Sequence, residues 1–159
     1  MIDWLPELIL LEHAHGNWEY YLELVYGVYQ DDFIFSKVNY KNIPVYRRRL
    51  PISEGKENAF WHLISCGDIE DKRNIDIRRC ERIKWPKPII EKTSSKSIWI
   101  WKNKRKSEER ILLYIHEERY LVVLGVRSGY LLLCTAYLVE RTHQHENLQA
   151  EYEEYLKYN

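Results

Sequence analysis

Between residues 97 and 140, apolar and aromatic side chains tend to occupy every second position. This pattern constrains the fold more than any other feature of the chain. Apolar and aromatic side chains recur at that period in four segments, which predicts four β-strands. Ser128 and Gly129 stand between the last two segments, and glycine suits the positive φ that a two-residue hairpin turn requires. We expect an antiparallel sheet with both faces of its central strands covered. The four segments read SIWIW, RILLYI, RYLVVLGV and YLLLCTAYLVE.

Residues 33–50 contain short β-prone pieces, FIF and VYRRR, broken by Asn-rich and Pro-containing turns, and most of the remaining chain carries helical patterns. Apolar residues repeat at intervals of three and four, Asn17 can cap the first helix, and Trp85-Pro86 ends the third. The resulting expectation is one α+β domain over residues 1–159, with N-terminal helices packed on a four-stranded antiparallel sheet and a closing C-terminal helix. The expected helices cover residues 17–30, Ser53 to about Gly67, about Ile75 to Lys84, and 143–157.

The composition argues for a cytoplasmic protein. No run of about 18 apolar residues is present, which argues against a membrane span. The N-terminal apolar stretch has no preceding Lys or Arg, unlike a secretory signal. The three cysteines are odd in number and lack CxxC spacing, which argues against a disulfide framework and a zinc knuckle.

Charge is distributed unevenly although the net charge is zero. Residues 1–36 hold seven acidic side chains and no Lys or Arg, whereas residues 72–106 hold thirteen Lys or Arg against three acids. This split predicts one surface that binds a polyanion such as RNA, and an acidic N-terminal surface that docks an inhibitor protein or a second copy of the chain. The alternative is that both are ordinary solvated faces.

Three arginines share one side of the third expected helix. At 100° per residue, Arg78, Arg79 and Arg82 lie opposite its apolar positions. Like charges stacked within two turns reduce stability unless an anion lies against them. This arrangement predicts a phosphate-binding surface.

The last strand and the second helix carry the residues best suited to catalysis. Strand alternation places Thr135 and Tyr137 about 7 Å apart on one face, together with Leu131 and Leu133. His62 is the best candidate for general acid–base chemistry because imidazole titrates near neutral pH. The structural alternatives are a half-exposed Thr–Tyr pair and a helical histidine that only packs.

Other catalytic motifs are missing from the sequence. It contains no Gly-rich phosphate loop, no GxSxG elbow and no paired-carboxylate motif. His143 and His145 have no neighbouring set that would complete a metal site, so we expect neither metal nor cofactor. Cations, one histidine, hydroxyls and rings suit metal-free RNA cleavage, in which the ribose 2′-OH attacks the adjacent phosphate.

Four segments resemble the PBECR group, phage-associated relatives of the barnase–EndoU–colicin–RelE nucleases. They cover nearly the whole chain in order: HGNWEYYLE (15–23), GKENAFWHLIS (55–65), RRCERIKWPKPII (78–90) and LLLCTAYLVE (131–140). The resemblance implies a RelE/barnase-like fold and a metal-independent endoribonuclease acting as a toxin or effector. Cys134 stands where the family pattern leads us to expect tryptophan, a departure that concerns packing.

The resemblance also implies the site residues. They are His62, Arg79, Arg82, Thr135 and Tyr137. From the chemistry of these side chains, His62 would move protons, Arg79 and Arg82 would hold the scissile phosphate, and Thr135 and Tyr137 would donate hydrogen bonds to its oxygens. Arg127 belongs to the wider pattern, but the simplest hairpin register turns it away from Thr135 unless a β-bulge intervenes. The residues expected to bind RNA are Arg78, Lys84, Lys104, Arg105 and Arg127.

A second hypothesis is a non-catalytic module of the same fold that binds RNA or a protein partner. The net charge of zero favours this alternative, because free ribonucleases are commonly basic. Binding without product formation would distinguish it from the enzyme.

Overall fold

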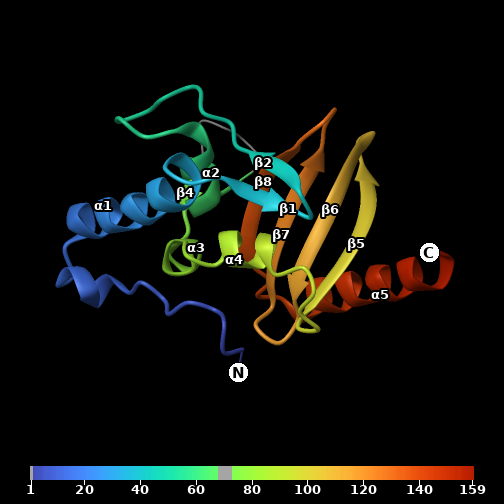
Figure 1. Ribbon diagram of the computed structural model, residues 1–159. Coiled ribbons are helices and arrows are strands. Elements are labelled where there is room, and N and C mark those ends of the chain that lie inside the picture. The colour runs from blue at the N-terminus through green and yellow to red at the C-terminus, as the bar shows by residue number, and fades with distance from the viewer. Residues whose placement is uncertain (1, 68–72) are drawn as a thin grey trace.

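A six-stranded sheet forms the centre of the computed structural model, which describes residues 2–67 and 73–159. The strand order is β1-β2-β8-β7-β6-β5 (Figure 1). The strands are β1 (Val38–Tyr40), β2 (Ile43–Tyr46), β5 (Ile98–Arg105), β6 (Glu108–Ile115), β7 (Tyr120–Val126) and β8 (Leu131–Leu138). A separate two-stranded ladder joins β3 (Ser65–Cys66) to β4 (Asn74–Ile75).

The four predicted strands are confirmed as β5 to β8, which pair antiparallel in chain order. Gly129 adopts the expected positive φ, at 84°, in the turn between β7 and β8. The prediction that the sheet has four strands, all antiparallel, is wrong. β1 and β2 extend it, and β2 runs parallel to β8. With three and four residues and a proline at position 44, these two strands are too short for alternation to reveal their pairing.

The described residues form seven helical segments around the sheet, so the α+β class is confirmed. Asn17 caps α1 as expected, since its side chain accepts a hydrogen bond of 2.9 Å from the Tyr20 N–H. Within the described residues, no helix has the length and apolar character needed to cross a membrane. The segments are η1 (Leu11–Ala14), α1 (Trp18–Tyr29), η2 (Gln30–Ile34), α2 (Asn58–Ile64), α3 (Ile77–Glu81), α4 (Pro86–Glu91) and α5 (Thr142–Tyr158).

Two predicted helices differ from the observed ones. The second begins at Asn58 rather than at Ser53, because Ser53 and Lys56 pair with each other in a tight turn. The third ends at Glu81, and the chain then starts α4 with Pro86 at its first position. The prediction that Trp85-Pro86 ends the third helix is therefore wrong, and Trp85 itself has helical backbone angles. Pro86 instead begins α4, because its fixed φ suits the first turn and its missing N–H is not needed there.

The sheet separates two apolar cores, which confirms that both faces of its central strands are covered. The larger core lies on the side of α1 to α4 and contains Tyr21, Phe60 and Ile64. The smaller core lies beneath α5 and contains Trp101, Tyr114 and Val123. Figure 1 shows the N-terminal helices and α5 on opposite sides of the sheet.

A β-bulge in β8 changes which residues face which core. Val123 of β7 pairs with Thr135, but the next residue, Leu124, pairs with Leu133, so Cys134 is the extra residue. Leu131 and Leu133 belong to the larger core, whereas Tyr137 packs against the smaller one. The prediction that Leu131, Leu133, Thr135 and Tyr137 share a face is therefore wrong for the two leucines. Because side chains alternate between the two faces of a strand, one extra residue places the odd-numbered side chains before it and after it on opposite faces.

Candidate functional site

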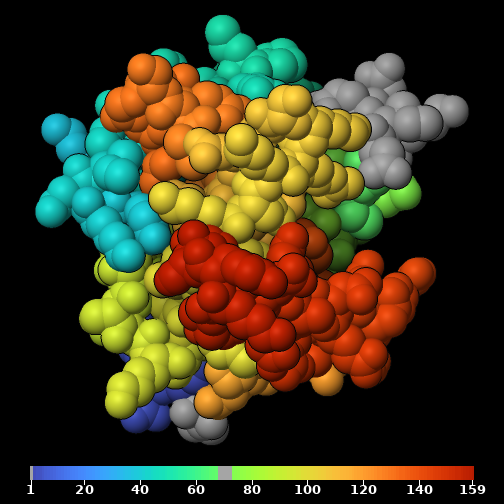
Figure 2. Space-filling view, turned by 90° about the vertical axis from the view of Figure 1, so that its right-hand side faces the viewer, coloured from blue at the N-terminus to red at the C-terminus, as the bar shows by residue number. Residues whose placement is uncertain are grey.

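The α5 face of the sheet is covered over only part of its length. Near one end, Tyr152 stacks on Trp99 and Glu151 accepts hydrogen bonds from Trp101 and Asn103. Beyond Asn103 the ends of the β5–β6 and β7–β8 hairpins project past α5. Figure 2 shows these hairpins, in yellow and orange, above the red helix. We call this uncovered region, formed by the strand ends next to the β5–β6 and β7–β8 turns, the open half of the sheet.

A pocket of about 210 Å³ lies where α2 meets the open half. Its lining combines polar side chains of α2, Asn58 and His62, with apolar side chains of β8, Leu132 and Leu133. Its lining residues are Arg48, Asn58, Ala59, His62, Glu108, Arg127, Leu132, Leu133 and Cys134. The pocket thus gathers two guanidinium groups, an imidazole and a carboxylate from four separate parts of the chain.

The bulge and a glycine determine how Arg127 reaches this pocket. Alternation along β7 places Arg127 on the α5 side, and the bulge brings Thr135 and Tyr137 to that same side. Arg127 Nη2 pairs with Glu108 Oε1 at 3.0 Å. A Cβ atom on Gly125 would lie 2.6 Å from Glu108 Oε1 and 2.8 Å from Arg127 Nη1. Because Gly125 has no side chain, this ion pair can lie directly on the strand.

Glu57 anchors the side of the pocket that carries Arg48 and His62. Its buried carboxylate accepts hydrogen bonds of 2.7 Å from the Tyr29 hydroxyl and 2.9 Å from Arg47 Nε. Burial alone would raise the pKa of Glu57, but these hydrogen bonds outweigh burial and hold it below its ordinary value. The Ala59 N–H then donates to the Arg48 carbonyl at 2.9 Å, which ties the start of α2 to the segment bearing Arg48. This network holds Arg48 and His62 on one wall.

Arg79 meets Thr135 and Tyr137, as the sequence predicted, but in a mostly buried position. Its Nη1 lies 3.5 Å from Thr135 Oγ1, and its guanidinium lies 5.2 Å from the centre of the Tyr137 ring. The same Nη1 donates to the Ser65 carbonyl at 2.6 Å. The side chain is 11% exposed, and burial lowers the pKa of Arg79. Arg79 therefore fastens the end of α2 to β8 from beside the pocket.

Arg82 is not brought together with these residues. It follows α3, stacks on Trp85 at 5.2 Å, and donates 3.2 Å and 3.4 Å hydrogen bonds to the Arg78 carbonyl and to Glu81. Its side chain is 14% exposed, so the prediction that three arginines present a common solvent-facing surface is wrong. Only Arg78 among the three is well exposed, at 51%, and it pairs with Glu81. The helix ends one turn earlier than predicted, which rotates Arg82 out of the expected face.

Of the other residues expected to bind RNA, Lys104 lines a second pocket together with Arg127 and Glu108, whereas Lys84 and Arg105 do not line it. The charge of Lys84 acts on Asp32, on the side of the N-terminal helices. Lys104 and Arg105 are neighbours in β5 and therefore point to opposite faces, with Arg105 on the α5 side. The first residue of the basic segment, Lys72, lies outside the described residues.

Sequence reasoning missed Arg48, Asn58 and Glu108. The run Arg47–Arg49 was a signal for the first of these, because adjacent cations on an extended segment point in alternate directions. Glu108 gave no local signal, since it reaches the pocket only through the pairing of β6 with β7. Among the described residues, no group of three or more His, Cys, Asp or Glu side chains is gathered that could hold a metal ion.

Comparison with models of known protein families, with curated proteins and with solved structures finds no match for this chain. The resemblance to the PBECR group therefore stays a prediction. The chemistry of the pocket has to be derived from its own residues.

Proposed function

We propose that this chain is a metal-independent endoribonuclease and that the pocket between α2 and the open half of the sheet is its active site. The observation that carries the proposal is that His62, Arg48 and Arg127 line one pocket together with Glu108. These groups correspond to what cleavage by an internal 2′-OH requires, namely proton transfer and fixed positive charge. The pocket opens on a surface that α5 leaves uncovered.

Two proton transfers are needed in this reaction. One group accepts the proton of the attacking 2′-OH, and another gives a proton to the departing 5′-oxygen. Glu108 and His62 face the same pocket from different walls and supply one group for each transfer, the carboxylate as base and the imidazole as acid. The products are a 2′,3′-cyclic phosphate on one fragment and a free 5′-hydroxyl on the other.

Positive charge stabilises the five-coordinate phosphorus that forms between these steps. Arg48 and Arg127 reach the pocket from opposite sides and present several N–H donors to phosphate oxygens. Arg79 is not among the residues that line the pocket. Because its hydrogen bonds go to the Ser65 carbonyl and Thr135, we assign it a positioning role rather than phosphate contact.

RNA cleavage in EDTA tests the proposal. Wild-type protein should cut single-stranded RNA and leave 2′,3′-cyclic phosphate ends. His62→Ala should lower the rate about a hundredfold or more, because a proton-transfer group is lost. Arg127→Ala should lower it by about one to two orders of magnitude through loss of transition-state charge stabilisation.

Two exposed residues of the same types provide matched controls. His143→Ala and Arg141→Ala alter a histidine and an arginine at the start of α5, outside the pocket, and should leave the rate unchanged. Equal rates for wild type, His62→Ala and Arg127→Ala would exclude the mechanism. The same result would show that any cleavage observed came from a contaminant.

A non-catalytic RNA-binding module is the second candidate. It is favoured by the Glu108–Arg127 ion pair, which occupies one of the two pocket arginines in the absence of RNA. Under this alternative RNA affinity should fall as salt rises, with a slope that follows the number of phosphates contacted, and no product should form. The toxin or effector role, with an inhibitor protein or second copy on the acidic N-terminal surface, is part of the enzyme proposal and is tested by co-purification.

A further inference from the structure

Two tyrosines from distant parts of the chain lie side by side next to the pocket. Tyr46 is the last residue of β2, and Tyr130 immediately precedes β8. Their ring centres are 5.3 Å apart, and the ring planes are tilted by 44°. Tyr46 is 53% exposed. A single exposed tyrosine needs no explanation, but a ring pair assembled beside cations does.

The pairing of β2 with β8 places these rings on the α5 side of the sheet. Val45 is buried in the larger core, so its neighbour Tyr46 points to the opposite face. Tyr130 likewise precedes Leu131, which is buried in the larger core. Tyr46 pairs directly with Leu132, and Leu132 lines the pocket. The ring pair and the pocket are therefore adjacent on one surface.

Each tyrosine is also connected to one of the pocket arginines. Arg48 follows Tyr46 by two residues, a separation of about 7 Å along an extended chain. The Arg127 N–H donates to the Tyr130 carbonyl at 3.0 Å, which closes the β7–β8 turn. Within the described part of the chain, neither phenolic hydroxyl makes a side-chain hydrogen bond that would fix its ring for a structural purpose. The two rings thus border the two guanidinium groups.

We propose that Tyr46 and Tyr130 form a stacking subsite for a base of single-stranded RNA, whose neighbouring phosphate enters the pocket between Arg48 and Arg127. Aromatic faces bind unstacked bases of any sequence, and flanking arginines follow the sugar–phosphate backbone. A duplex keeps its bases stacked on one another and cannot use such a subsite. The inference deepens the proposed nuclease by naming single-stranded RNA as its substrate class.

The test measures binding separately from cleavage. A fluorescently labelled 2′-O-methyl oligonucleotide has no free 2′-OH and cannot be cut, so its affinity can be followed by anisotropy. Tyr46→Ala should weaken binding roughly tenfold through loss of one stacking partner, and Tyr130→Ala should act in the same direction. Tyr46→Phe should bind as the wild type does, because the ring is kept.

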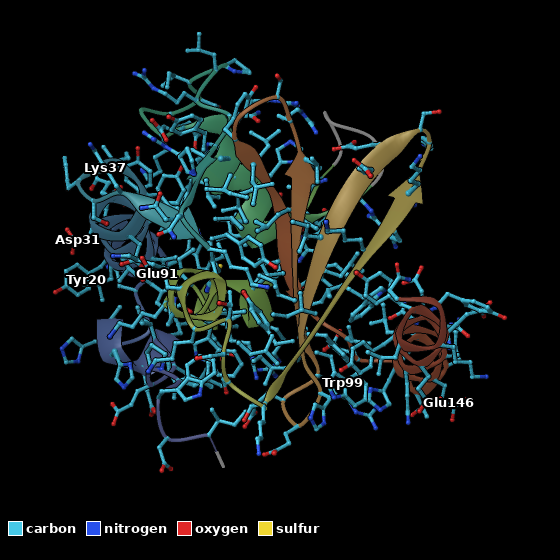
Figure 3. All side chains as sticks on the ribbon, turned by 45° about the vertical axis from the view of Figure 1, so that its right-hand side comes forward. Tyr20, Asp31, Lys37, Glu91, Trp99 and Glu146 are labelled. Atoms are coloured by element: carbon cyan, nitrogen blue, oxygen red, sulfur yellow. The ribbon has the colours of Figure 1, made fainter. Side chains whose placement is uncertain are left out.

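Tyr20→Ala is the matched control. Tyr20 is 52% exposed, almost the same as Tyr46, but lies on α1, which Figure 3 places on the far side of the sheet from α5. Its removal should not change affinity. A second probe of the same length with abasic positions should bind wild type and Tyr46→Ala equally. Circular dichroism of each variant verifies that the fold is kept.

The outcomes separate this inference from the nuclease proposal. Equal affinity of wild type, Tyr46→Ala and Tyr130→Ala for the base-containing strand would overturn the stacking subsite, even if unmodified RNA is cut. An equal loss on the abasic strand would also overturn it, because the effect would not depend on bases. Base-dependent binding without cleavage of unmodified RNA would support the subsite and reject the nuclease.

Discussion

Asp32 illustrates how a single partly buried group can make stability depend on pH. Burial raises the pKa of Asp32 to about 6; the cation of Lys87 opposes this effect, and the anions of Asp31 and Glu91 add to it. Figure 3 shows Asp31 and Glu91 on the side of the N-terminal helices. The native state therefore holds the proton more tightly than the unfolded chain does. The resulting stabilisation is complete below about pH 4 and is lost as the pH rises through about 6.

Replacing Asp32 by asparagine should remove this dependence. At pH 8 the free energy of unfolding of Asp32→Asn should exceed that of the wild type by about 1 kcal/mol, a value reduced for partial solvent exposure. At pH 4 the two proteins should have nearly equal stability. Urea unfolding at both pH values measures the difference, with Asp3→Asn at an exposed aspartate remote from Asp32 in sequence as control. A difference of the same size at pH 4 and pH 8 would contradict the explanation.

At the scale of elements, α5 depends on a few aromatic contacts. None of its residues is buried, and isolated helices of this length are marginal in water. Tyr152 stacks on Trp99 with ring centres 4.8 Å apart and planes 9° apart, and it also contacts Trp101. Trp99 in turn stacks on His116 at 4.3 Å. This ladder of rings holds the helix against the smaller core and leaves the open half uncovered.

Tyr152→Ala should therefore loosen α5 specifically. We expect a loss of about 2 kcal/mol in the free energy of unfolding, below the value for a fully buried aromatic residue because Tyr152 is half-buried. Tyr158, also on α5 but 78% exposed, supplies the control, and Tyr158→Ala should have little effect. Urea unfolding followed by circular dichroism measures both. Similar losses for the two variants would mean that the ring ladder does not hold the helix.

At the scale of the whole molecule, the protection of backbone amides against hydrogen exchange should decrease from the centre of the sheet outwards. β7 is paired on both sides and almost entirely buried, whereas β1 is an edge strand of three residues. Hydrogen exchange at the amides of β7 should require global unfolding, while the amides of β1 and α5 should exchange through local opening. Mass spectrometry of deuterated peptides can rank the segments. Protection of β1 or α5 equal to that of β7 would contradict this order.

Local patterns were enough to predict most elements and part of the site. Strand alternation identified β5 to β8, the Gly129 turn followed from its need for positive φ, and Asn17 marked the start of α1. Each of these features depends on residues close in sequence, or on the face that a regular element presents, and the chain encodes both directly. The meeting of Arg79 with Thr135 and Tyr137 was an expectation from the resemblance to the PBECR group.

The remaining features arise from pairing between distant segments. The parallel contact of β2 with β8 brings Tyr46 beside Tyr130, and the bulge at Cys134 turns Arg127 and Thr135 to a common face. Neither has a local signal, because register and bulges result from how two strands and their cores fit together. The same fit buries Arg82 against Trp85 and brings Glu108 opposite His62. Local patterns therefore specified the elements, and long-range packing determined which charged and aromatic side chains share the pocket.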